Sequence, residues 1–504
     1  MLSLAEILVG SAVSALSLYL FFELNSRGRH YAPGPRGYPI IGNILDVSPL
    51  GPWIKFTEYK ARYGNLIFFY GLGNNVLVLN SLKAMNDLLD KQGGTFSHRP
   101  AFTVVGELMG LGQSMALLEY GNEWRTQRKL AHMALSPTAV KKYYVVQEDL
   151  AVLLCKGLLI TPKRFFDHVR LVSSRIILSI TYGLTIEAAD DEYITHADDT
   201  MRMIGKATVP GAFLCDLVPI LKYLPSWVPF RRRAEAGKEL IERLVSKPFN
   251  HVVKEMAQGN APPSLLQDLF LANSGGELGH QLKWSTGSMY GGALFSGLSN
   301  FATILTFIMA MALYPETQRL AQAEIDKIVG TERLPMITDM PNLPYVNAVV
   351  KETMRWHPAL PLGIARRTSE DSFYEGYFIP KNTVVMPNVW CISAVAFEPN
   401  DKYDPQKFIP ERFINDSDTP NPASWAFGFG RRICPGKHLA ENSVFIQIAS
   451  ILAMFDISPP QKGELKPEFG LNLVSYPAEF DCTILPRSEV KAEILLSRAS
   501  ECKL

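Results

Sequence analysis

The sequence predicts a mainly α-helical domain with small β-sheets, preceded by one N-terminal transmembrane helix. Helix-period segments dominate from about Ser81 onward, short β-rich runs lie near both ends, and an uncharged apolar stretch opens the chain. With 504 residues, 47% hydrophobic and 20% charged, the composition is typical of a globular protein with a large core. No repeat or inter-domain linker interrupts the chain after the N-terminal segment, which favours a single domain.

The N-terminal segment reads as a retained membrane anchor over residues 1–24. No charge occurs from Ile7 to Phe22, and with the apolar residues before Glu6 the helix approaches the ~20 residues that span a bilayer. A cleaved signal peptide would need basic residues before the apolar core and a small-residue cleavage site after it, and neither is present. Arginines follow the segment, which places the remainder of the chain in the cytosol.

Residues 25–45 form a basic and proline-rich hinge, in which Ala32-Pro33-Gly34-Pro35 is a stiff segment. Two β-rich runs follow, Leu66 to Tyr70 and Val76 to Asn80, and the glycines between them predict a hairpin. Short strands are also expected around 374–379 and 480–485. The glycines of the hairpin are turn residues, because nothing downstream completes a dinucleotide or phosphate-binding loop.

A second uncharged stretch runs from Trp284 to Pro315 and is long enough to cross a membrane. It contains several Ser, Thr, Asn and Gly residues and lacks aromatic belts, which favours a long helix buried through the centre of the domain. Its polar residues are then expected to face a pocket.

Net charge and cysteine spacing argue against a nucleic-acid-binding protein and against a disulfide-stabilised one. The net charge of +1 gives no reason to expect nucleic acid as a partner. The cysteines at 155, 215, 391, 434, 482 and 502 show no paired spacing, so a disulfide framework is not expected and a reducing compartment is the simpler assumption.

One cysteine stands in a distinctive loop, which reads Phe427-Gly428-Phe429-Gly430-Arg431-Arg432-Ile433-Cys434-Pro435-Gly436. A thiolate needs positive surroundings and nearby N–H groups to stay ionised, and the arginines and glycines offer both. A predicted helix over about 438–455 would direct its positive N-terminal end at the sulfur.

This decapeptide resembles the heme-binding loop of the cytochromes P450, whose pattern Phe-x-x-Gly-x-Arg-x-Cys-x-Gly it fills at every fixed position. The resemblance runs from about Pro33 to Pro486 and implies a cytochrome P450 catalytic domain over residues 46–504. It also implies heme b as the cofactor, with the Cys434 thiolate as the axial ligand of the iron and with Phe427 and Gly436 in the cofactor-binding loop.

Further residues acquire roles through the same resemblance. Glu352 and Arg355 match the family's Glu-x-x-Arg helix, and with Arg412 of the Pro-Glu-Arg-Phe segment they are expected to form a buried charge network that locks the cysteine loop. Arginine and an indole N–H suit carboxylates. The expected partners of the heme propionates are Trp124, Arg128, Arg432 and Arg366.

The sequence departs from the family in the central helix. Counting back from Tyr314, the oxygen-activation motif falls on 295–300, where Leu298 replaces the usual acid and Ser299 replaces the usual threonine. Ser299 and Asn300 are the candidate catalytic residues, and Thr303 could order water. A one-turn shift of register would instead place Ser296 or Thr303 at the iron, and it still finds no acid.

Segments that the resemblance assigns to the substrate pocket are apolar, which predicts a small apolar substrate such as a terpenoid or other secondary metabolite. These segments are 101–118, 201–217, 293–299, 360–364 and 471–474. The overall sequence, including Trp390 and the cysteine loop, is similar to that of fungal microsomal members of the family.

The predicted function is monooxygenation with O2. Electrons are expected from a separate NADPH–cytochrome P450 reductase, because the chain has no flavin or nicotinamide motif. The expected location is the endoplasmic reticulum membrane, single-pass, with the catalytic domain cytosolic. Two alternatives remain open: a P450-type isomerase or dehydratase that acts without O2 activation, and a non-catalytic heme-binding protein.

Overall fold

The computed structural model describes residues 29–38, 41–48, 50–208, 212–273, 278–395 and 402–502. The predicted anchor at 1–24 lies outside these residues. Among the helices in the described ranges, none is both long enough and apolar enough to cross a membrane.

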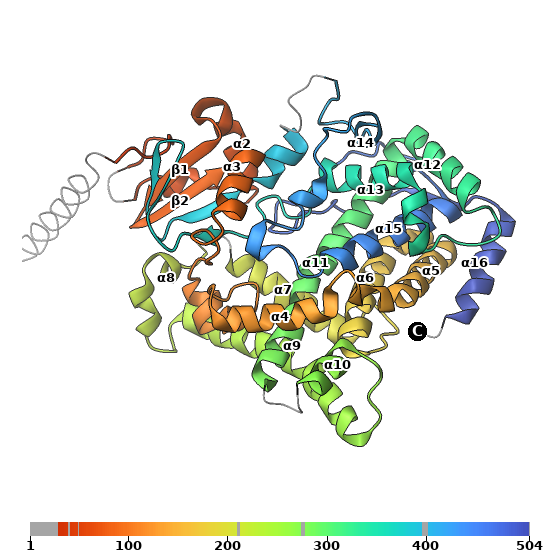
Figure 1. Cartoon of the computed structure of the whole chain (residues 1–504), viewed down its shortest axis with the longest axis horizontal. Coiled ribbons are helices and arrows are strands. Elements are labelled where there is room, and N and C mark those ends of the chain that lie inside the picture. Colours follow the sequence, from red (N-terminus) through yellow and green to blue (C-terminus); the bar gives the residue numbers. More distant parts are fainter. Residues whose placement is uncertain are drawn as a thin grey trace, which may run out of the picture.

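Helices make up most of the molecule, and a small β region packs against one end (Figure 1). The α-helices are α2 (Pro52–Tyr63), α3 (Leu82–Met85), α4 (Asn122–Leu135), α5 (Tyr144–Ile160), α6 (Phe165–Tyr182), α7 (Glu192–Ala207), α8 (Leu214–Leu217), α9 (Pro229–Gln258), α10 (Leu265–Ala272), α11 (Gly279–Leu313), α12 (Pro315–Ile328), α13 (Pro344–Trp356), α14 (Arg412–Asn415), α15 (Lys437–Met454) and α16 (Glu489–Glu501). This architecture confirms the predicted mainly helical class.

In the described ranges, the strands form one mixed sheet and two short antiparallel pairs. They are β1 (Leu66–Gly71), β2 (Asn74–Leu79), β3 (Arg366–Arg367), β4 (Ser372–Tyr374), β5 (Tyr377–Ile379), β6 (Val384–Pro387), β7 (Phe455–Ser458) and β8 (Thr483–Pro486). The sheet order is β1-β2-β6-β3, with β2 and β6 parallel and the other pairs antiparallel. The hairpin predicted near residue 70 is confirmed, with Leu66 opposite Leu79.

The strand region predicted at 374–379 is a hairpin of β4 and β5. Glu375 and Gly376 have φ of 50° and 83° at its turn, a left-handed conformation that glycine adopts at little cost. The sequence pattern around 374–379 does not show that the chain reverses its direction here, because the turn is only two residues long.

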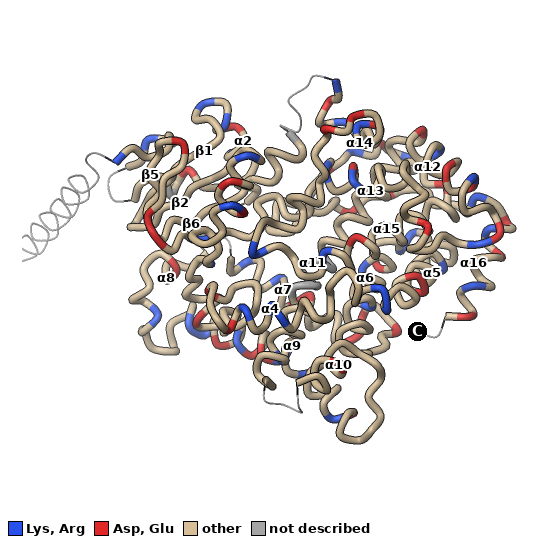
Figure 2. The backbone as a smooth tube through the Cα atoms, in the orientation of Figure 1, with Lys and Arg blue, Asp and Glu red and all other residues tan. Residues whose placement is uncertain are grey.

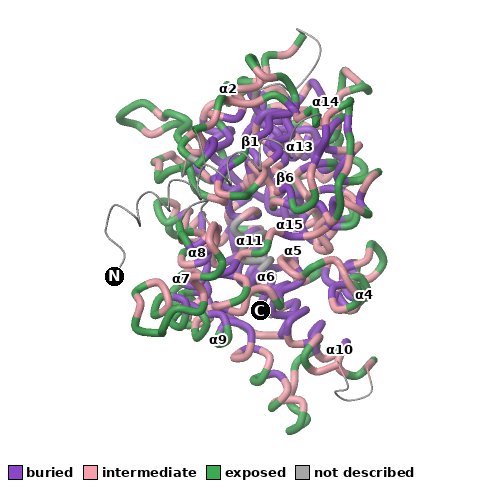
Figure 3. Tube along the Cα trace, turned by 90° about the vertical axis from the view of Figure 1, so that its left-hand side faces the viewer, coloured by how far each residue is buried: buried purple, intermediate pink, exposed green. Residues whose placement is uncertain are grey.

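α11 passes through the middle of the helical region and contacts α6, α9, α4 and α15 (Figure 1). Every residue from Phe301 to Ala312 except Thr303 is buried, and Figure 3 shows the buried residues concentrated around α11, α13 and α15. The uncharged stretch is therefore a core helix, as predicted, since its apolar side chains are covered by other helices. Charged residues of both signs occupy the outer segments instead (Figure 2).

The proline-rich hinge is fastened along the outer strand of the sheet. Phe68 N donates to Pro33 O at 2.9 Å, and the buried Asn43 amide donates to Pro35 O at 2.6 Å and accepts from Tyr70 N at 3.0 Å. The hinge thus satisfies the edge groups of β1 that would otherwise stay unpaired. Gly34 is required here, because a Cβ would lie 2.0 Å from Phe68 O.

We expect Gly34→Ala to lower the free energy of unfolding by about 1–3 kcal/mol, since the new methyl group must displace the β1 backbone. Urea-induced unfolding followed by circular dichroism measures this change. Gly205→Ala on α7 is the control, because a Cβ there meets nothing within 4 Å and alanine favours a helix. Equal stability of the two variants would contradict the close approach at Gly34.

Candidate active site

The cysteine loop is closed by its own backbone and begins a helix. Cys434 N donates to Phe427 O at 2.8 Å, and α15 starts at Lys437. Gly430 has a φ of 47°, and a Cβ there would lie 2.6 Å from Leu89 O. The glycine therefore lets the loop pack against the residues that follow α3, and the N-terminus of α15 lies close to the sulfur.

The Cys434 thiol lies in a setting that is apolar but has positive partners. Burial raises its pKa, whereas the Gly436 N–H and the Arg128 guanidinium oppose that rise. Arg128 reaches the loop directly, because its Nη1 donates to Ile433 O at 2.6 Å. Coordination to a metal ion would remove the thiol proton outright, and the N–H and the guanidinium would stabilise the thiolate.

Three buried arginines, Arg99, Arg366 and Arg432, gather beside the loop. They donate to backbone carbonyls only, at Ala116, Ile364 and Ala365 for Arg99, at Leu89 and Phe429 for Arg366, and at Ser97, Met115 and Leu118 for Arg432. Among the described residues, no carboxylate accepts a hydrogen bond from any of the three. Burial lowers the pKa of Arg432 to about 10 and that of Arg366 to about 10.

Such a cluster of like charges is costly and is relieved by an anion. Burial and the charges of the other two arginines also lower the pKa of Arg99. A flat group that carries two carboxylates and an iron atom fits this setting, because its carboxylates would pair with the guanidiniums while the iron takes the sulfur. The residues present therefore fit heme.

Trp124 lies next to this cluster. Its side chain is buried, and the Arg432 guanidinium lies over its ring at 4.7 Å from the centroid. The structure thus brings Trp124, Arg128 and Arg366 into contact with the loop that contains Arg432. Contacts of these four residues with propionates stay a prediction.

Arg99 was not among the residues predicted from the sequence. Its pattern, His98-Arg99-Pro100, is short, and a single arginine before a proline is common on protein surfaces. The one available signal was its position at the start of the apolar segment 101–118. Its burial becomes visible only because Ile364 and Ala365, far along the chain, supply its acceptors.

The predicted charge network is present and fully buried. Arg355 makes a two-point contact with Glu352, with Nε to Oε2 at 2.7 Å and Nη2 to Oε1 at 2.8 Å, and Arg412 Nε lies 3.3 Å from Oε1. Burial raises the pKa of the Glu352 carboxyl, and the guanidiniums and the Ile409 N–H oppose that rise.

The network also holds backbone that leads to the cysteine loop. Arg355 donates to the carbonyls of Ser393, Pro405 and Lys407. The Ser393 hydroxyl donates to Arg355 O at 2.8 Å and accepts from the indole of Trp425 at 3.3 Å, just before the loop begins. Glu352 therefore belongs to a buried network that stabilises the segment presenting Cys434, and it is not one half of a surface ion pair.

On α11, the structure describes Ser299 and Asn300, whereas the side chain of Leu298 lies outside the description. Ser299 and Thr303 stand one helical turn apart and are partly exposed within an otherwise buried run, and Thr303 Oγ1 donates to Ser299 O at 2.7 Å. Asn300 is buried. A line of hydroxyl and amide groups on this helix can hold water, but none of these groups is an acid.

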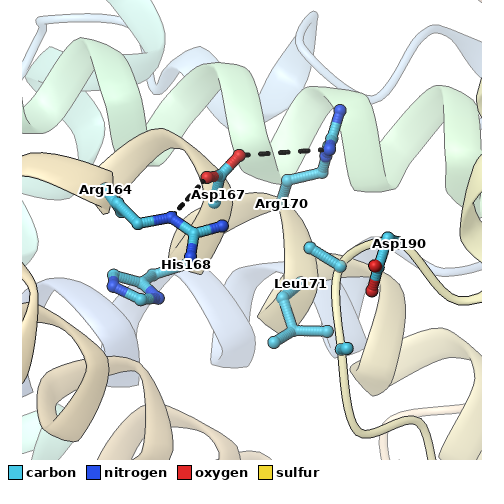
Figure 4. Close-up of a pocket in the computed structure, with 8 residues that line it drawn as sticks. Arg164, Asp167, His168, Arg170, Leu171 and Asp190 are labelled. Atoms are coloured by element: carbon cyan, nitrogen blue, oxygen red, sulfur yellow. Dashed lines mark hydrogen bonds and ion pairs between the residues drawn. The ribbon is translucent and has the colours of Figure 1, made fainter.

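A surface pocket of about 370 Å³ lies elsewhere, against α6 (Figure 4). Arg164 donates to Asp167, and Arg170 pairs with Asp198. These are solvated ion pairs of small energetic value, and none of the residues that line this pocket belongs to the cysteine loop.

The sequence profile of the family "Cytochrome P450" matches residues 32–483. The chain belongs to the cytochrome P450 family. Membership assigns a heme cofactor with cysteine thiolate ligation of the iron, and monooxygenase chemistry. Cys434 is the cysteine that stands in the family's loop pattern, and the buried arginines lie beside it.

Relatives cover nearly the whole chain. The cytochrome P450 monooxygenase COX2 of Coprinopsis cinerea is 38% identical over 95% of this chain and 94% of its own length. The cytochrome P450 monooxygenase ppsD of Aspergillus oryzae is 36% identical over 90% of this chain and 89% of its own. A zebra fish cytochrome P450 structure with abiraterone, at 23% identity and a TM-score of 0.69, covers 87% of this chain and 100% of its own and shows the shared fold.

We expect Arg355→Ala to abolish heme incorporation and not merely to slow turnover. The change leaves the buried Glu352 carboxylate without its two-point partner, which costs about 3–5 kcal/mol. Heme content per protein, measured from the absorbance of the pyridine complex, reports the loss. Arg319→Ala removes an exposed helix pair with Glu316 and is the matched control. Normal heme content in Arg355→Ala would contradict the structural role of the network.

We expect Arg99→Ala to speed heme loss roughly tenfold or more, because a charged hydrogen-bond donor contributes about 1.5–3 kcal/mol and three carbonyls lose their partner. Transfer of heme to apomyoglobin measures the rate. Arg431→Ala changes an exposed arginine of the cysteine loop and should leave the rate unchanged. If both variants lose heme at the same rate as the unaltered protein, Arg99 has no part in cofactor retention.

Proposed function

We propose that this cytochrome P450 hydroxylates a small apolar substrate, such as a terpenoid or another secondary metabolite. The observation that carries this proposal is the absence of any charged residue from Trp284 to Pro315, on the helix that passes through the core. An ionic substrate would find no counter-charge on that stretch of the helix. The fungal origin of the relatives is consistent with secondary metabolism.

When bound, heme supplies the activation of O2, and the remaining work belongs to this chain. The thiolate of Cys434 would donate electron density to the iron, and the buried arginines would hold the propionates. Ser299 and Thr303 would hold water at the substrate side and pass protons from it. Leu298 stands where the family has an acid, so the substrate itself or solvent would supply the proton instead.

Electrons would come from an NADPH–cytochrome P450 reductase. Exposed cations stand on α4 and in the cysteine loop, at Arg125, Lys129 and Arg431. Arg128 of the same helix reaches Ile433. A basic surface beside the thiolate suits an acidic flavoprotein, and attraction between the two would speed their association.

The proposed location is the endoplasmic reticulum membrane, with the catalytic domain in the cytosol. The apolar sequence of residues 1–24 supports an anchor. Exposed apolar side chains occur on the hinge and in the segment that contains α8, at the same end of the molecule (Figure 1): Tyr38, Leu45, Leu214, Ile220, Tyr223 and Trp227. An apolar surface there would rest on lipid.

One observation favours a second function. Leu298 removes the acid that the family uses in proton delivery, which an isomerase or dehydratase of oxygenated substrates would not need. Such an enzyme would use the same Cys434 loop and the same arginines, and it would need neither reductase nor O2.

Reconstitution with the reductase tests the proposal. We expect apolar substrates to stimulate O2 uptake and NADPH consumption and to yield hydroxylated products by mass spectrometry. Cys434→Ser is the control, and it should lose both the reaction and the red-shifted Soret band of the reduced carbon monoxide complex. Ser299→Ala should lower the product formed per NADPH several-fold, since one proton relay is lost.

Failure of every substrate to stimulate O2 uptake would overturn monooxygenation. Conversion of a hydroperoxide without reductase or NADPH would support the second function. An intact carbon monoxide spectrum with neither reaction would indicate a non-catalytic heme protein.

A further inference from the structure

His357 joins two segments that are far apart in the sequence. It follows α13 directly, and its imidazole is buried. The ring lies flat on Phe469, with centroids 3.5 Å apart and planes inclined by 8°. The ring of Trp390 makes a T-shaped contact with it, with centroids 5.1 Å apart. Ring stacking of this kind gives an orientation as well as apolar burial.

Two hydrogen bonds determine which nitrogen of the His357 ring carries the proton. His357 Nε2 lies 2.7 Å from Ser475 Oγ, and the Ser475 hydroxyl donates to Gly470 O at 2.6 Å. A hydroxyl has a single proton and a carbonyl only accepts, so His357 Nε2 must be the donor. The network therefore assigns the neutral tautomer with a proton on Nε2. Burial lowers the pKa of His357 to about 3, so the ring stays neutral at physiological pH.

The backbone adds a third link. Ser475 N donates to Ala359 O at 2.9 Å. Residues 357–359 and 469–475 are thus held together by a ring stack, a side-chain hydrogen bond and a backbone hydrogen bond.

The two segments lead to different parts of the candidate site. The stretch after His357 leads to Ile364, whose carbonyl accepts from Arg99, and then to Arg366, which donates to Phe429 in the loop. The other segment ends at Tyr476, whose ring meets Phe301 of α11 at 5.4 Å. The histidine therefore links the segment that leads to the arginines beside Cys434 with the segment that contacts α11.

We propose that His357 is a positioning residue that fixes segments 360–364 and 471–474 relative to each other and so determines which bulky ligands the substrate pocket accepts. The inference rests on the proposed function and on the expectation, implied by the family resemblance, that these segments line the pocket. It assigns His357 no contact with the reacting atoms.

Binding of two nitrogen ligands of the iron tests this inference. Imidazole is small and reports access to the iron, whereas 4-phenylimidazole also reports the shape of the pocket. The variants are His357→Phe, which keeps a flat ring without a donor, Ser475→Ala, which removes the hydroxyl, and the double variant. Ser450→Ala, at a buried serine on α15, is the matched control.

We expect His357→Phe and Ser475→Ala each to weaken 4-phenylimidazole binding about tenfold, because a loosened segment must be ordered on binding. Imidazole binding should change less than about twofold, and the double variant should be no weaker than either single one. His357→Gln, which places an amide donor near the Nε2 position, should restore most of the affinity.

Equal weakening of both ligands would show a general loss of heme-site structure, and no change in either would show that the link does not shape the pocket. Either result overturns the inference, and additive effects in the double variant do so too. Ser475→Ala keeps the test decisive if His357→Phe does not retain heme. Because the assay needs iron ligation and not turnover, its outcome is independent of whether O2 uptake is observed.

Discussion

The burial of one carboxylate between two guanidiniums is the constraint on which the rest of this structure depends. Glu352, Arg355 and Arg412 are fully buried, and any one of them without the others would be an isolated charge in an apolar core. Arg355 and Arg412 also donate to backbone carbonyls of 393–409, a stretch without regular secondary structure over most of its described residues. The charge network therefore does for this stretch what a sheet would do elsewhere, which is to satisfy its backbone.

A second set of charges acts in the opposite way. The three arginines beside Cys434 are satisfied by carbonyls, yet their charges have no described counter-ion among their hydrogen-bond partners. Burial and the charges of neighbouring arginines lower their pKa values. The first cluster contains its own carboxylate, whereas the arginines of the second would gain carboxylate partners from a dianionic cofactor. This difference separates a residue set that stabilises the fold from one that recognises a ligand.

The substrate side is arranged by weaker interactions. Ser299 and Thr303 are partly exposed polar residues of α11 that lie within an otherwise buried run of described residues. His357 joins the segment after α13 to the C-terminal turn through one hydrogen bond and one ring stack. Interactions of this size hold a wall in place without making it rigid. Substitutions here are thus expected to alter which substrate fits before they alter the fold.

Local sequence patterns were enough to predict the helical class, the buried central helix, the first hairpin, the cysteine loop and the Glu352–Arg355 pair. Each of these depends on residues that are close in the sequence, so that periodicity, turn residues and spacing report them directly. The burial of Arg99, the attachment of the hinge to β1 and the tether at His357 became visible in the folded chain alone. In each case the partner lies far along the chain: Ile364 for Arg99, Phe68 for Pro33 and Ser475 for His357. A side chain becomes buried and paired only when folding brings such partners together, and no local pattern carries that information.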